Sequence, residues 1–337
     1  MKIFIKTYGC QANINDSEIL AAQFKKQGYQ LTNSEKTADL IFINSCSVKN
    51  KTQSKTLHYI KKYYSSKKII VGGCLIKTLD LKKQFLKLII KDTKNIQRLG
   101  NPLIRKNKEI AIIQISQGCL NNCTYCATKL AKGKLKSYPV SKIKKQLEKS
   151  IKDKCKIIYL TSQDNSCYGF DLRPKTNLAK LLEELIKVQG NYKIRVGMAH
   201  PGHLKKYFEE LLEVMICEKI QKFLHIPVQS GSNKILKEMK RGHTVKDFEK
   251  IVLEFRKNFP EITISTDIIV GYPTETEKDF QMTLKLVEKI KPEVLNISGF
   301  SSRPRTEASK LKQLASEIIK ERTRKLDRIY ENYRQNI

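Results

Sequence analysis

Three cysteines stand close together in the sequence, as Cys119-Leu-Asn-Asn-Cys123-Thr-Tyr-Cys126. Three thiolates in one loop can hold three irons of a cubane iron–sulfur cluster and leave the fourth iron open to a small molecule. A structural zinc site uses four protein ligands, commonly from paired CxxC units. Because the sequence has no second CxxC unit, the spacing favours an iron–sulfur cluster with one open position.

A second set of cysteines, Cys10, Cys46 and Cys74, is widely spaced along the chain. Each follows a short β-branched run that predicts a strand; the runs are Ile3–Ile5, Leu40–Ile43 and Ile69–Val71. Loops at the carboxyl edge of a parallel sheet converge, so these thiols can meet and ligate a second cluster. From the residues alone, ordinary packing of small cysteines near strand ends is an equal alternative.

The chain has nine cysteines, and its first residues are too charged for a signal peptide. Since the cytosol keeps thiols reduced, we expect a cytoplasmic protein with metal-bound cysteines rather than disulfides. Cys155 and Cys217 are interpreted as packing residues, and Cys167 is left undecided. No run approaches the roughly 18 consecutive apolar residues of a membrane helix, so we expect no membrane association.

The formal net charge is +32, with 65 Lys+Arg against 33 Asp+Glu. A surplus of this size attracts a polyanion, because neutralised phosphates release condensed counterions. A lysine-rich composition bias is the alternative. The charge favours a nucleic-acid partner.

The elements that must position the cysteines alternate between strand and helix. In the first part of the chain, helical apolar spacing in Asp16–Gln27 and Lys51–Tyr64 separates the predicted strands. This alternation predicts a parallel sheet with crossover helices, a Rossmann- or flavodoxin-like domain over residues 1–98. The polar stretch from Asp92 to Lys108 is interpreted as a linker.

Beyond this linker the alternation resumes. Six strands are predicted at about Ile110–Ser116, Ile157–Thr161, Lys193–Met198, Phe223–Val228, Ile262–Val270 and Val294–Ser298. Ser141–Ile151 has helical spacing, and Thr244 and Thr276 begin helix-start boxes. The pattern predicts an α/β fold with a partial (βα)6 barrel of the TIM type over residues 99–300.

After the barrel, the charged stretch from Glu307 to about Tyr333 predicts a helical tail within residues 301–337. Among the histidines, His225 is expected to be a satisfied core residue and His200 is a pocket candidate. His58, His203 and His243 are expected at surface or loop positions.

The cysteine motifs resemble those of the radical S-adenosylmethionine (SAM) methylthiotransferases over nearly the whole chain. The N-terminal matches are Tyr8-Gly-Cys10-Gln-Ala-Asn13-Ile-Asn-Asp16-Ser-Glu18, Asn44-Ser-Cys46-Ser-Val and Gly72-Gly-Cys74. CxxxCxxC is common to the wider radical SAM superfamily. The N-terminal cysteine triplet is therefore the feature that points to the methylthiotransferases within it. The resemblance implies that the triplet holds a second cluster.

Other motifs resemble the archaeal and eukaryotic branch of that family. They are Cys126-Ala-Thr-Lys129-Leu-Ala-Lys132-Gly133, Leu160-Thr-Ser-Gln163-Asp164, Arg195-Val-Gly-Met198, Phe223-Leu-His225-Ile-Pro-Val-Gln229-Ser230-Gly231-Ser232 and Thr266-Asp267-Ile-Ile-Val-Gly271-Tyr-Pro273-Thr-Glu275-Thr. This branch acts on N6-threonylcarbamoyladenosine next to the tRNA anticodon. Related branches act on isopentenyladenosine in tRNA or on a ribosomal protein.

The resemblance implies two 4Fe-4S clusters and SAM as cofactors. Cys119, Cys123 and Cys126 would hold the cluster that cleaves SAM to a 5′-deoxyadenosyl radical. Cys10, Cys46 and Cys74 would hold the auxiliary cluster that supplies sulfur, and a second SAM would supply the methyl group. All six are expected to be metal ligands and part of the catalytic machinery.

Seven further residues are candidates for binding SAM: Tyr125, Gln163, Asp164, Ser230, Ser232, Arg241 and Gly271. Tyr125 could pack on the adenine, with simple loop packing as the alternative. Gln163 and Asp164 end a predicted strand and could meet the methionine amino and carboxylate groups. Arg241 could pair with that carboxylate through its planar fork, or be a solvated surface residue. Gly271 permits close backbone approach.

For tRNA, we expect contacts from basic residues beside the cluster loop and after the last strand: Lys129, Lys132, Lys134, Lys136, Arg303 and Arg305. Other expected partners are a low-potential electron donor, such as ferredoxin or flavodoxin, and a sulfur donor. Family members end in a small β-barrel RNA-binding domain, which we expect to be absent, since no strand-rich segment follows Tyr333.

The sequence departs from the family at Ala199-His200-Pro201, where Asn before Pro is expected, and at Pro273-Thr-Glu275, where Pro-Gly-Glu is usual. Three rival hypotheses remain open. They are a methylthiotransferase with another target, a non-catalytic iron–sulfur protein for RNA binding or electron transfer, and a structural zinc module.

Overall fold

The computed structural model describes residues 1–47 and 50–335. The chain has an α/β fold with parallel sheets, as the alternating pattern predicts. Backbone contacts divide it into two compact units. The first comprises Met1–Cys119, Ala127–Gln163 and Val188–Tyr192, and the second comprises Leu120–Cys126, Asp164–Lys187 and the residues from Lys193 onward.

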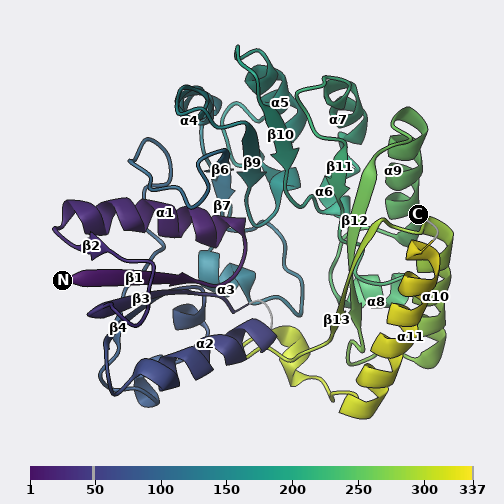
Figure 1. The fold of residues 1–337 in the computed structure, drawn as a ribbon. Helices are drawn as coiled ribbons and strands as arrows, with labels where there is room; N and C mark the ends of the chain where they lie inside the picture. The colour runs from purple at the N-terminus through teal and green to yellow at the C-terminus, as the bar shows by residue number, and fades with distance from the viewer. Residues whose placement is uncertain (48–49, 336–337) are drawn as a thin grey trace. The chain divides into compact units, whose positions relative to one another are not determined.

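The first unit contains a five-stranded parallel sheet in the order β2-β1-β3-β4-β5. Its strands are β1 (Lys2–Thr7), β2 (Gln30–Leu31), β3 (Leu40–Ser45), β4 (Lys68–Gly73) and β5 (Ile89–Ile90). Helices α1 (Gln11–Lys26) and α2 (Asn50–Tyr63) cover its opposite faces (Figure 1).

The central strand β3 is buried along its whole length, as expected for a parallel strand covered on both faces. Successive side chains point to opposite faces of a sheet. Leu40 and Phe42 therefore pack in one core with Phe24 of α1. Ile41 and Ile43 pack in another core with Ile60 of α2.

A second part of the first unit carries the parallel pair β6 (Ile110–Gln114) and β9 (Ile157–Thr161). The antiparallel pair β7 (Ser116–Gln117) and β8 (Lys136–Ser137) encloses the short helix α3 (Thr128–Lys132) in the sequence, and α4 (Val140–Lys152) follows. Helix α1 packs against β6, so the segment after Asp92 continues into the same unit.

The second unit contains the parallel sheet β11-β12-β13. The strands of this sheet are β11 (Phe223–His225), β12 (Thr263–Val270) and β13 (Val294–Gly299), and the unit also contains β10 (Lys193–Val196), which belongs to another sheet. Its helices before the tail are α5 (Leu178–Ile186), α6 (Pro201–Leu204), α7 (Phe208–Met215), α8 (Asn233–Glu238), α9 (Val245–Asn258) and α10 (Glu277–Ile290). The predicted capping boxes at Thr244 and Thr276 are both present.

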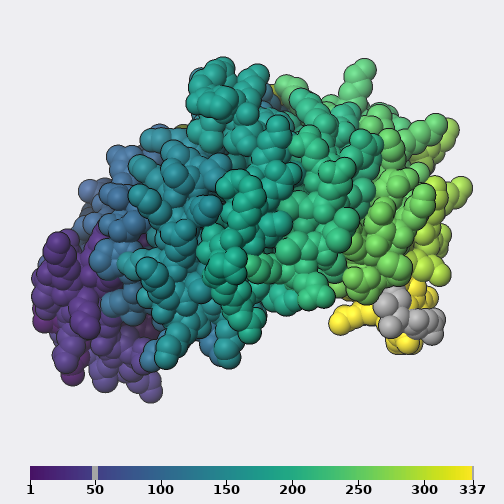
Figure 2. Space-filling model, turned by 90° about the horizontal axis from the view of Figure 1, so that it is seen from above, coloured from purple at the N-terminus to yellow at the C-terminus, as the bar shows by residue number. Residues whose placement is uncertain are grey.

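The helical tail begins later than expected. Residues Glu307–Lys310 form a short 3-10 turn, and the long helix α11 runs over Ser316–Arg334. It packs along α10 and β13 (Figure 1), and its yellow residues border green residues of the second unit in Figure 2. Its Arg322 donates to the carboxylate of Glu275 at 2.9 Å, with both side chains buried. The tail is thus an integral part of the second unit.

Most predicted strands lie within two or three residues of their observed bounds, and Ile157–Thr161 matches β9. The long stretch predicted as one strand from Ile110 is divided into β6 and β7. Within the described residues, no helix is both long and apolar enough to cross a membrane. The predicted domain limits at residues 98 and 300 remain predictions.

Candidate cluster-binding sites

The loops that carry the N-terminal cysteines meet at one edge of the first sheet. Cys10 follows β1 and precedes α1, Cys46 follows β3, and Cys74 follows β4. A Cβ atom placed on Gly9 would lie 2.9 Å from the Cβ of Cys46. The backbone N–H of Cys74 donates to the carbonyl of Ser45 at 2.9 Å. The fold therefore brings the three predicted ligands together.

Two asparagines tie the first two loops together. The Asn13 amide donates to the carbonyls of Tyr8 and Ser45, at 2.8 and 3.0 Å. The Asn44 amide donates in return to the carbonyl of Asn13 at 2.8 Å. Both asparagines are fully buried, so their bonds are not shared with solvent. These residues hold the cysteine loops in position, and their role was not predicted.

The third loop is fixed by Ser45 and by Gly73. The Ser45 hydroxyl donates to the carbonyl of Gly72 and accepts from the N–H of Leu75. Gly73 has φ +88°, and a Cβ there would lie 2.3 Å from the Ser45 carbonyl oxygen. Only glycine permits this approach. The sequence signal was present in Gly72-Gly73-Cys74, but its partner was not predictable.

The triplet suits a cluster better than a single ion. Cys46 and Cys74 are buried and Cys10 is exposed. Among residues 1–47 and 50–335, no three Cys, His, Asp or Glu side chains converge to hold one metal ion. In a cubane each thiolate binds its own iron, so the sulfurs need not converge on one point. The three-thiol donor set therefore fits an iron–sulfur cluster.

A buried lysine, Lys132, acts on the pKa of one cysteine of the triplet. Burial raises the pKa of Cys74 to about 12, while the Lys132 ammonium acts to lower it. Lys132 was predicted to contact RNA, but only 5% of the residue is exposed and its ammonium pairs with Asp16 at 3.3 Å. That prediction is wrong for Lys132, because its side chain is buried and paired with Asp16.

The CxxxCxxC loop begins in the first unit. The Cys119 N–H donates to the carbonyl of Gly133 at 3.2 Å. The neighbouring Gly118 N–H donates to Oε1 of Gln163 at 2.7 Å. Gly118 has φ +77°, and a Cβ would lie 2.0 Å from the carbonyl oxygen of Lys134. Gln163 was expected to meet SAM with its side chain. In the structure its Oε1 instead accepts a bond from the start of the cluster loop.

Within the second unit, Thr124 anchors the remainder of the loop. Its N–H donates to the Met239 carbonyl at 3.2 Å, and its carbonyl accepts from Ala308 at 2.9 Å. Its hydroxyl lies 2.9 Å from the hydroxyl of Tyr272. These bonds fix the backbone between Cys123 and Cys126.

Arg241 is buried against this loop. Its guanidinium donates to the Cys123 sulfur at 3.5 Å, to the Tyr125 hydroxyl at 3.4 Å and to the Pro227 carbonyl at 2.7 Å. Only 5% of the residue is exposed, so the alternative of a solvated surface arginine is wrong. Burial raises the pKa of Tyr125, although the nearby Arg241 charge opposes this. Tyr125 stays a neutral donor and acceptor.

Comparisons with known proteins identify this arrangement. Residues 113–287 match the model of the Radical SAM superfamily, and residues 2–92 match the Uncharacterized protein family UPF0004. The chain is 42% identical to a probable threonylcarbamoyladenosine tRNA methylthiotransferase of Pyrococcus abyssi, over 98% of this chain and 84% of that protein. The human threonylcarbamoyladenosine tRNA methylthiotransferase is 38% identical, over 98% of this chain and 63% of that protein.

The chain belongs to the radical SAM family of threonylcarbamoyladenosine tRNA methylthiotransferases. As a radical SAM enzyme, it uses SAM and an iron–sulfur cluster. The resemblance inferred from the cysteine motifs is confirmed.

Solved structures confirm the fold. The radical SAM methyltransferase TsrM of Kitasatospora setae is similar with a TM-score of 0.64 at 12% identity, over 91% of this chain and 77% of that chain. The cobalamin-dependent radical SAM enzyme OxsB is similar with a TM-score of 0.59 at 14% identity, over 98% of this chain and 56% of that chain. At these identities the likeness concerns the fold alone.

Asp164 organises a buried polar cluster in the second unit of this methylthiotransferase. Its carboxylate accepts from Ser166 at 2.6 Å, from the His200 N–H at 3.2 Å and from the Asn121 amide at 2.8 Å. Asn121 lies between the first two cysteines of the CxxxCxxC loop. Asp164 is wholly buried, so the carboxylate predicted to meet SAM also holds this loop.

The nearby histidines differ partly from expectation. His243 is buried, with 6% exposure, and burial lowers its pKa to about 4. His243 lies in the loop before α9, as one of its two expected positions had it, but it is not at the surface. His203 is half-buried, and its Nε2 lies 2.9 Å from Oδ1 of Asn121. His200 is buried, and its Nδ1 accepts from the Gly202 N–H at 3.0 Å. His225 contacts the carboxylate of Asp267.

The remaining SAM candidates have structural partners of their own. Ser232 caps α8 and donates to Asp279 at 2.7 Å, and Ser230 accepts from the Ser232 N–H at 3.2 Å. Gly271 has φ +81°, and a Cβ there would lie 2.6 Å from a side-chain carbon of Ile319 on α11. The close approach at Gly271 is thus made by the tail helix.

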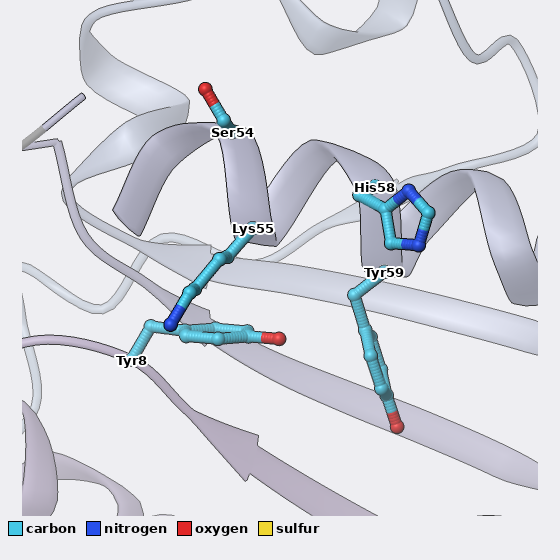
Figure 3. A pocket seen from close by; sticks show the side chains of 5 residues that line it. All are labelled: Tyr8, Ser54, Lys55, His58 and Tyr59. Carbon is cyan, nitrogen blue, oxygen red and sulfur yellow. The ribbon is translucent and has the colours of Figure 1, made fainter. Parts of the chain in front are cut away.

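An open hollow of about 390 Å³ lies beside the Cys10 loop, in the first unit (Figure 3). Five side chains line it: Tyr8, Ser54, Lys55, His58 and Tyr59. The rings of Tyr8 and Tyr59 meet edge to face at 6.3 Å. Lys55 extends from α2 towards Tyr8. Aromatic faces and a cation beside the cysteine triplet were not predicted as a site.

Proposed function

We propose that this enzyme converts N6-threonylcarbamoyladenosine in tRNA into its 2-methylthio derivative. The observation that carries the proposal is that the loops of Cys10, Cys46 and Cys74 meet at one sheet edge, where buried asparagine and serine bonds join them. A radical SAM enzyme needs one cluster to cleave SAM, and the three thiols at the edge of the first sheet would hold another. The relatives named for this reaction are similar along 98% of the chain.

The proposed roles of the cysteines follow from the two sites. Cys119, Cys123 and Cys126 would hold the cluster that binds SAM, and Cys10, Cys46 and Cys74 would hold the auxiliary 4Fe-4S cluster. When bound, these groups and SAM supply the radical, the sulfur and the methyl group. The protein holds the ligand loops rigid and keeps both sites positioned.

Arg241 and Tyr125 would shape the SAM-binding side of the loop. The Arg241 guanidinium is wedged against Cys123, so it stabilises thiolate charge there. Tyr125 would pack on the cofactor, oriented by its contact with Arg241. Gln163 and Asp164 would set the loop position from either end. Ser230 and Ser232 would contact SAM, and Gly271 would act through its contact with the tail helix.

For tRNA, we propose the exposed lysines Lys134 and Lys136, the half-buried Lys129 and the exposed Arg305. Arg303 was also predicted to contact tRNA, but it is 93% buried, so that prediction is wrong. The hollow beside Cys10 would receive a nucleotide of the RNA. The rings of Tyr8 and Tyr59 would stack on its base, and Lys55 would attract its phosphate. A low-potential reductant and a sulfur donor complete the proposed partners, in the cytoplasm.

The experiment is nucleoside mass spectrometry. Reconstituted protein is incubated anaerobically with reductant, SAM and tRNA that carries threonylcarbamoyladenosine, and parallel reactions contain isopentenyladenosine tRNA. A methylthio mass gain on the first substrate alone is expected. A gain on the second alone would overturn the substrate assignment. Intact clusters with neither 5′-deoxyadenosine nor a mass gain would favour the non-catalytic alternative.

A further inference from the structure

Lys132 is a buried cation whose partner is already engaged. Its side chain is 6% exposed, and its Nζ lies 3.3 Å from Oδ2 of Asp16, which is fully buried. The same carboxylate accepts two bonds from Arg98, at 2.8 and 3.2 Å, and one from Gln114 at 2.8 Å. Arg98 therefore neutralises the charge of Asp16 through a bidentate pair. The positive charge of Lys132 is additional to this balanced pair.

The three buried charges do not balance. Arg98 and Lys132 each carry one positive charge, and Asp16 supplies one negative charge. Arg98 satisfies its other donors on Gln117 and on the carbonyls of Thr93, Lys94 and Ile96. Lys132 has three N–H donors, and within residues 1–47 and 50–335 its Nζ has only Asp16 as a hydrogen-bond acceptor.

An unbalanced buried cation is costly, because transfer from water costs several kcal/mol per ion unless an opposite charge is close. A lysine in such a place would ordinarily lose its proton. Besides Asp16, the groups whose negative charge acts on Lys132 are the thiols of Cys74 and Cys10. An anion held at the triplet would supply the missing charge and accept the free donors.

The position of Lys132 places it at the triplet. It ends α3, which packs against the 3-10 turn Leu75–Lys77 that directly follows Cys74. Its partner Asp16 lies on α1, whose N-cap is Cys10. Although burial acts to lower the pKa of Lys132, the charges of Cys74 and Asp16 outweigh it and the pKa is raised.

We propose that Lys132 is the buried counter-ion of the auxiliary cluster, and that its charge makes this cluster easier to reduce. The inference rests on the proposed function, because it requires a cluster at Cys10, Cys46 and Cys74. A core of charge two plus held by three thiolates is a net anion, and reduction adds one more negative charge. A cation in a buried, weakly screened site stabilises the reduced form more than the oxidised form. Lys132 is a positioning residue that acts through the cluster.

The test isolates the auxiliary cluster in the full chain. Cys119, Cys123 and Cys126 are replaced by alanine, so that only the N-terminal triplet can hold iron. Redox titration followed by electron paramagnetic resonance then compares Lys132 with Lys132→Met, which keeps the length and removes the charge. We expect the ratio of reduced to oxidised cluster at a fixed potential to fall at least about tenfold, which is ~59 mV for one electron.

Lys134→Met is the matched control, since it removes the same charge from an exposed lysine two positions away. Its screened charge should leave the potential nearly unchanged. Equal potentials for Lys132→Met, Lys134→Met and the parent would overturn the proposal. Absence of iron in the parent with the intact triplet would overturn the auxiliary cluster itself, and with it this inference.

Lys132→Met could also prevent cluster assembly. In that case iron content is compared for Lys132→Arg and Lys132→Gln, with thermal unfolding as the check on folding. Iron retained by the arginine variant and lost by the glutamine variant supports a counter-ion. Iron lost from both, in folded protein, would overturn it, since shape rather than charge would then be required.

Discussion

The two cysteine sites of this enzyme are built in opposite ways. The CxxxCxxC site is one continuous loop, and short-range connectivity keeps its thiols within reach of one another. The N-terminal triplet is assembled from three loops that follow β1, β3 and β4, and Asn13, Asn44 and Ser45 join them through buried hydrogen bonds. The first site depends on local sequence, and the second depends on the whole sheet.

The difference extends to electrostatics. In the second unit, Arg241 contacts the Cys123 sulfur directly at 3.5 Å. In the first unit, the cation near the triplet is Lys132, paired with a shared carboxylate. Each site thus has one buried cation from a distant part of the sequence. A cluster bound by three thiolates would be anionic, and under the proposed function these two cations would compensate that charge.

The largest effects should come from the cysteines themselves. Cys126→Ala should abolish 5′-deoxyadenosine and methylthio product together, to below the detection limit. Cys46→Ala should leave 5′-deoxyadenosine formation within about a few-fold of the parent and abolish the product, because it affects the site proposed to supply sulfur. Liquid chromatography with mass spectrometry measures both compounds in one reaction. Full product from Cys46→Ala would remove the functional difference between the sites.

Asn44→Ala should break the triplet without touching a ligand. The change removes amide bonds to the carbonyl of Asn13 and to the hydroxyl of Ser17, at 2.8 and 2.9 Å. Each buried bond contributes about 1 kcal/mol, and the orphaned carbonyl adds to the cost, so the free energy of unfolding should fall by about 2–3 kcal/mol. Iron content should fall towards that of one cluster.

Asn177→Ala is the matched control for this variant. Asn177 is also an asparagine with a structural bond, since its side chain caps α5 by accepting from the Lys180 N–H at 3.0 Å. Loss of the cap should cost about 1 kcal/mol and leave iron content unchanged. If both variants lose the same amount of iron, general destabilisation explains the loss and the specific role of Asn44 is wrong.

Local and distant features were predictable to different degrees. The strands before Cys10, Cys46 and Cys74 were predicted because β-branched runs and loop positions are local signals. The bonds from Asn13 to Ser45 and from Asn44 to Asn13 were not predicted, because each joins residues about thirty positions apart. Lys132 was misread as an RNA contact, since its partner Asp16 is 116 positions distant in sequence. Periodicity and spacing carry no information on such pairs.

The cluster loop shows the same limit. CxxxCxxC identified the ligands, whereas Arg241 was left between a cofactor contact and a surface position. Its burial depends on the backbone carbonyl of Pro227, which only the folded chain places beside it. The tail helix also begins at Ser316 rather than Glu307, because Gln313 bonds the carbonyls of Ala308 and Leu311 and holds that stretch outside the helix.

Arg241→Gln should weaken the CxxxCxxC site and spare the triplet. The change removes the charge beside Cys123 and the bond to Tyr125, so 5′-deoxyadenosine formation should fall by about 10–100-fold, an effect of about 1.4–2.7 kcal/mol. Iron at the triplet should be unaffected. Arg256→Gln, which loses bonds to Glu293 and to the end of α10, is the control for stability. An equal loss of 5′-deoxyadenosine in both variants would contradict a direct role for Arg241.

The smallest effect should come from the hollow beside Cys10. Lys55→Glu reverses an exposed charge on α2 next to the rings of Tyr8 and Tyr59, so it should raise the Kd for substrate tRNA by about 3–10-fold at low salt. The fold increase should shrink as salt rises, because ions screen the contact.

Lys142→Glu, on the exposed face of α4, is the control for a general loss of positive charge. If both variants weaken tRNA binding equally, the affinity depends only on the net charge of +32, and the hollow has no specific part in binding. Weakening by Lys55→Glu alone, with 5′-deoxyadenosine formation unchanged, would place the RNA at the triplet and extend the contrast between the two cysteine sites to the substrate.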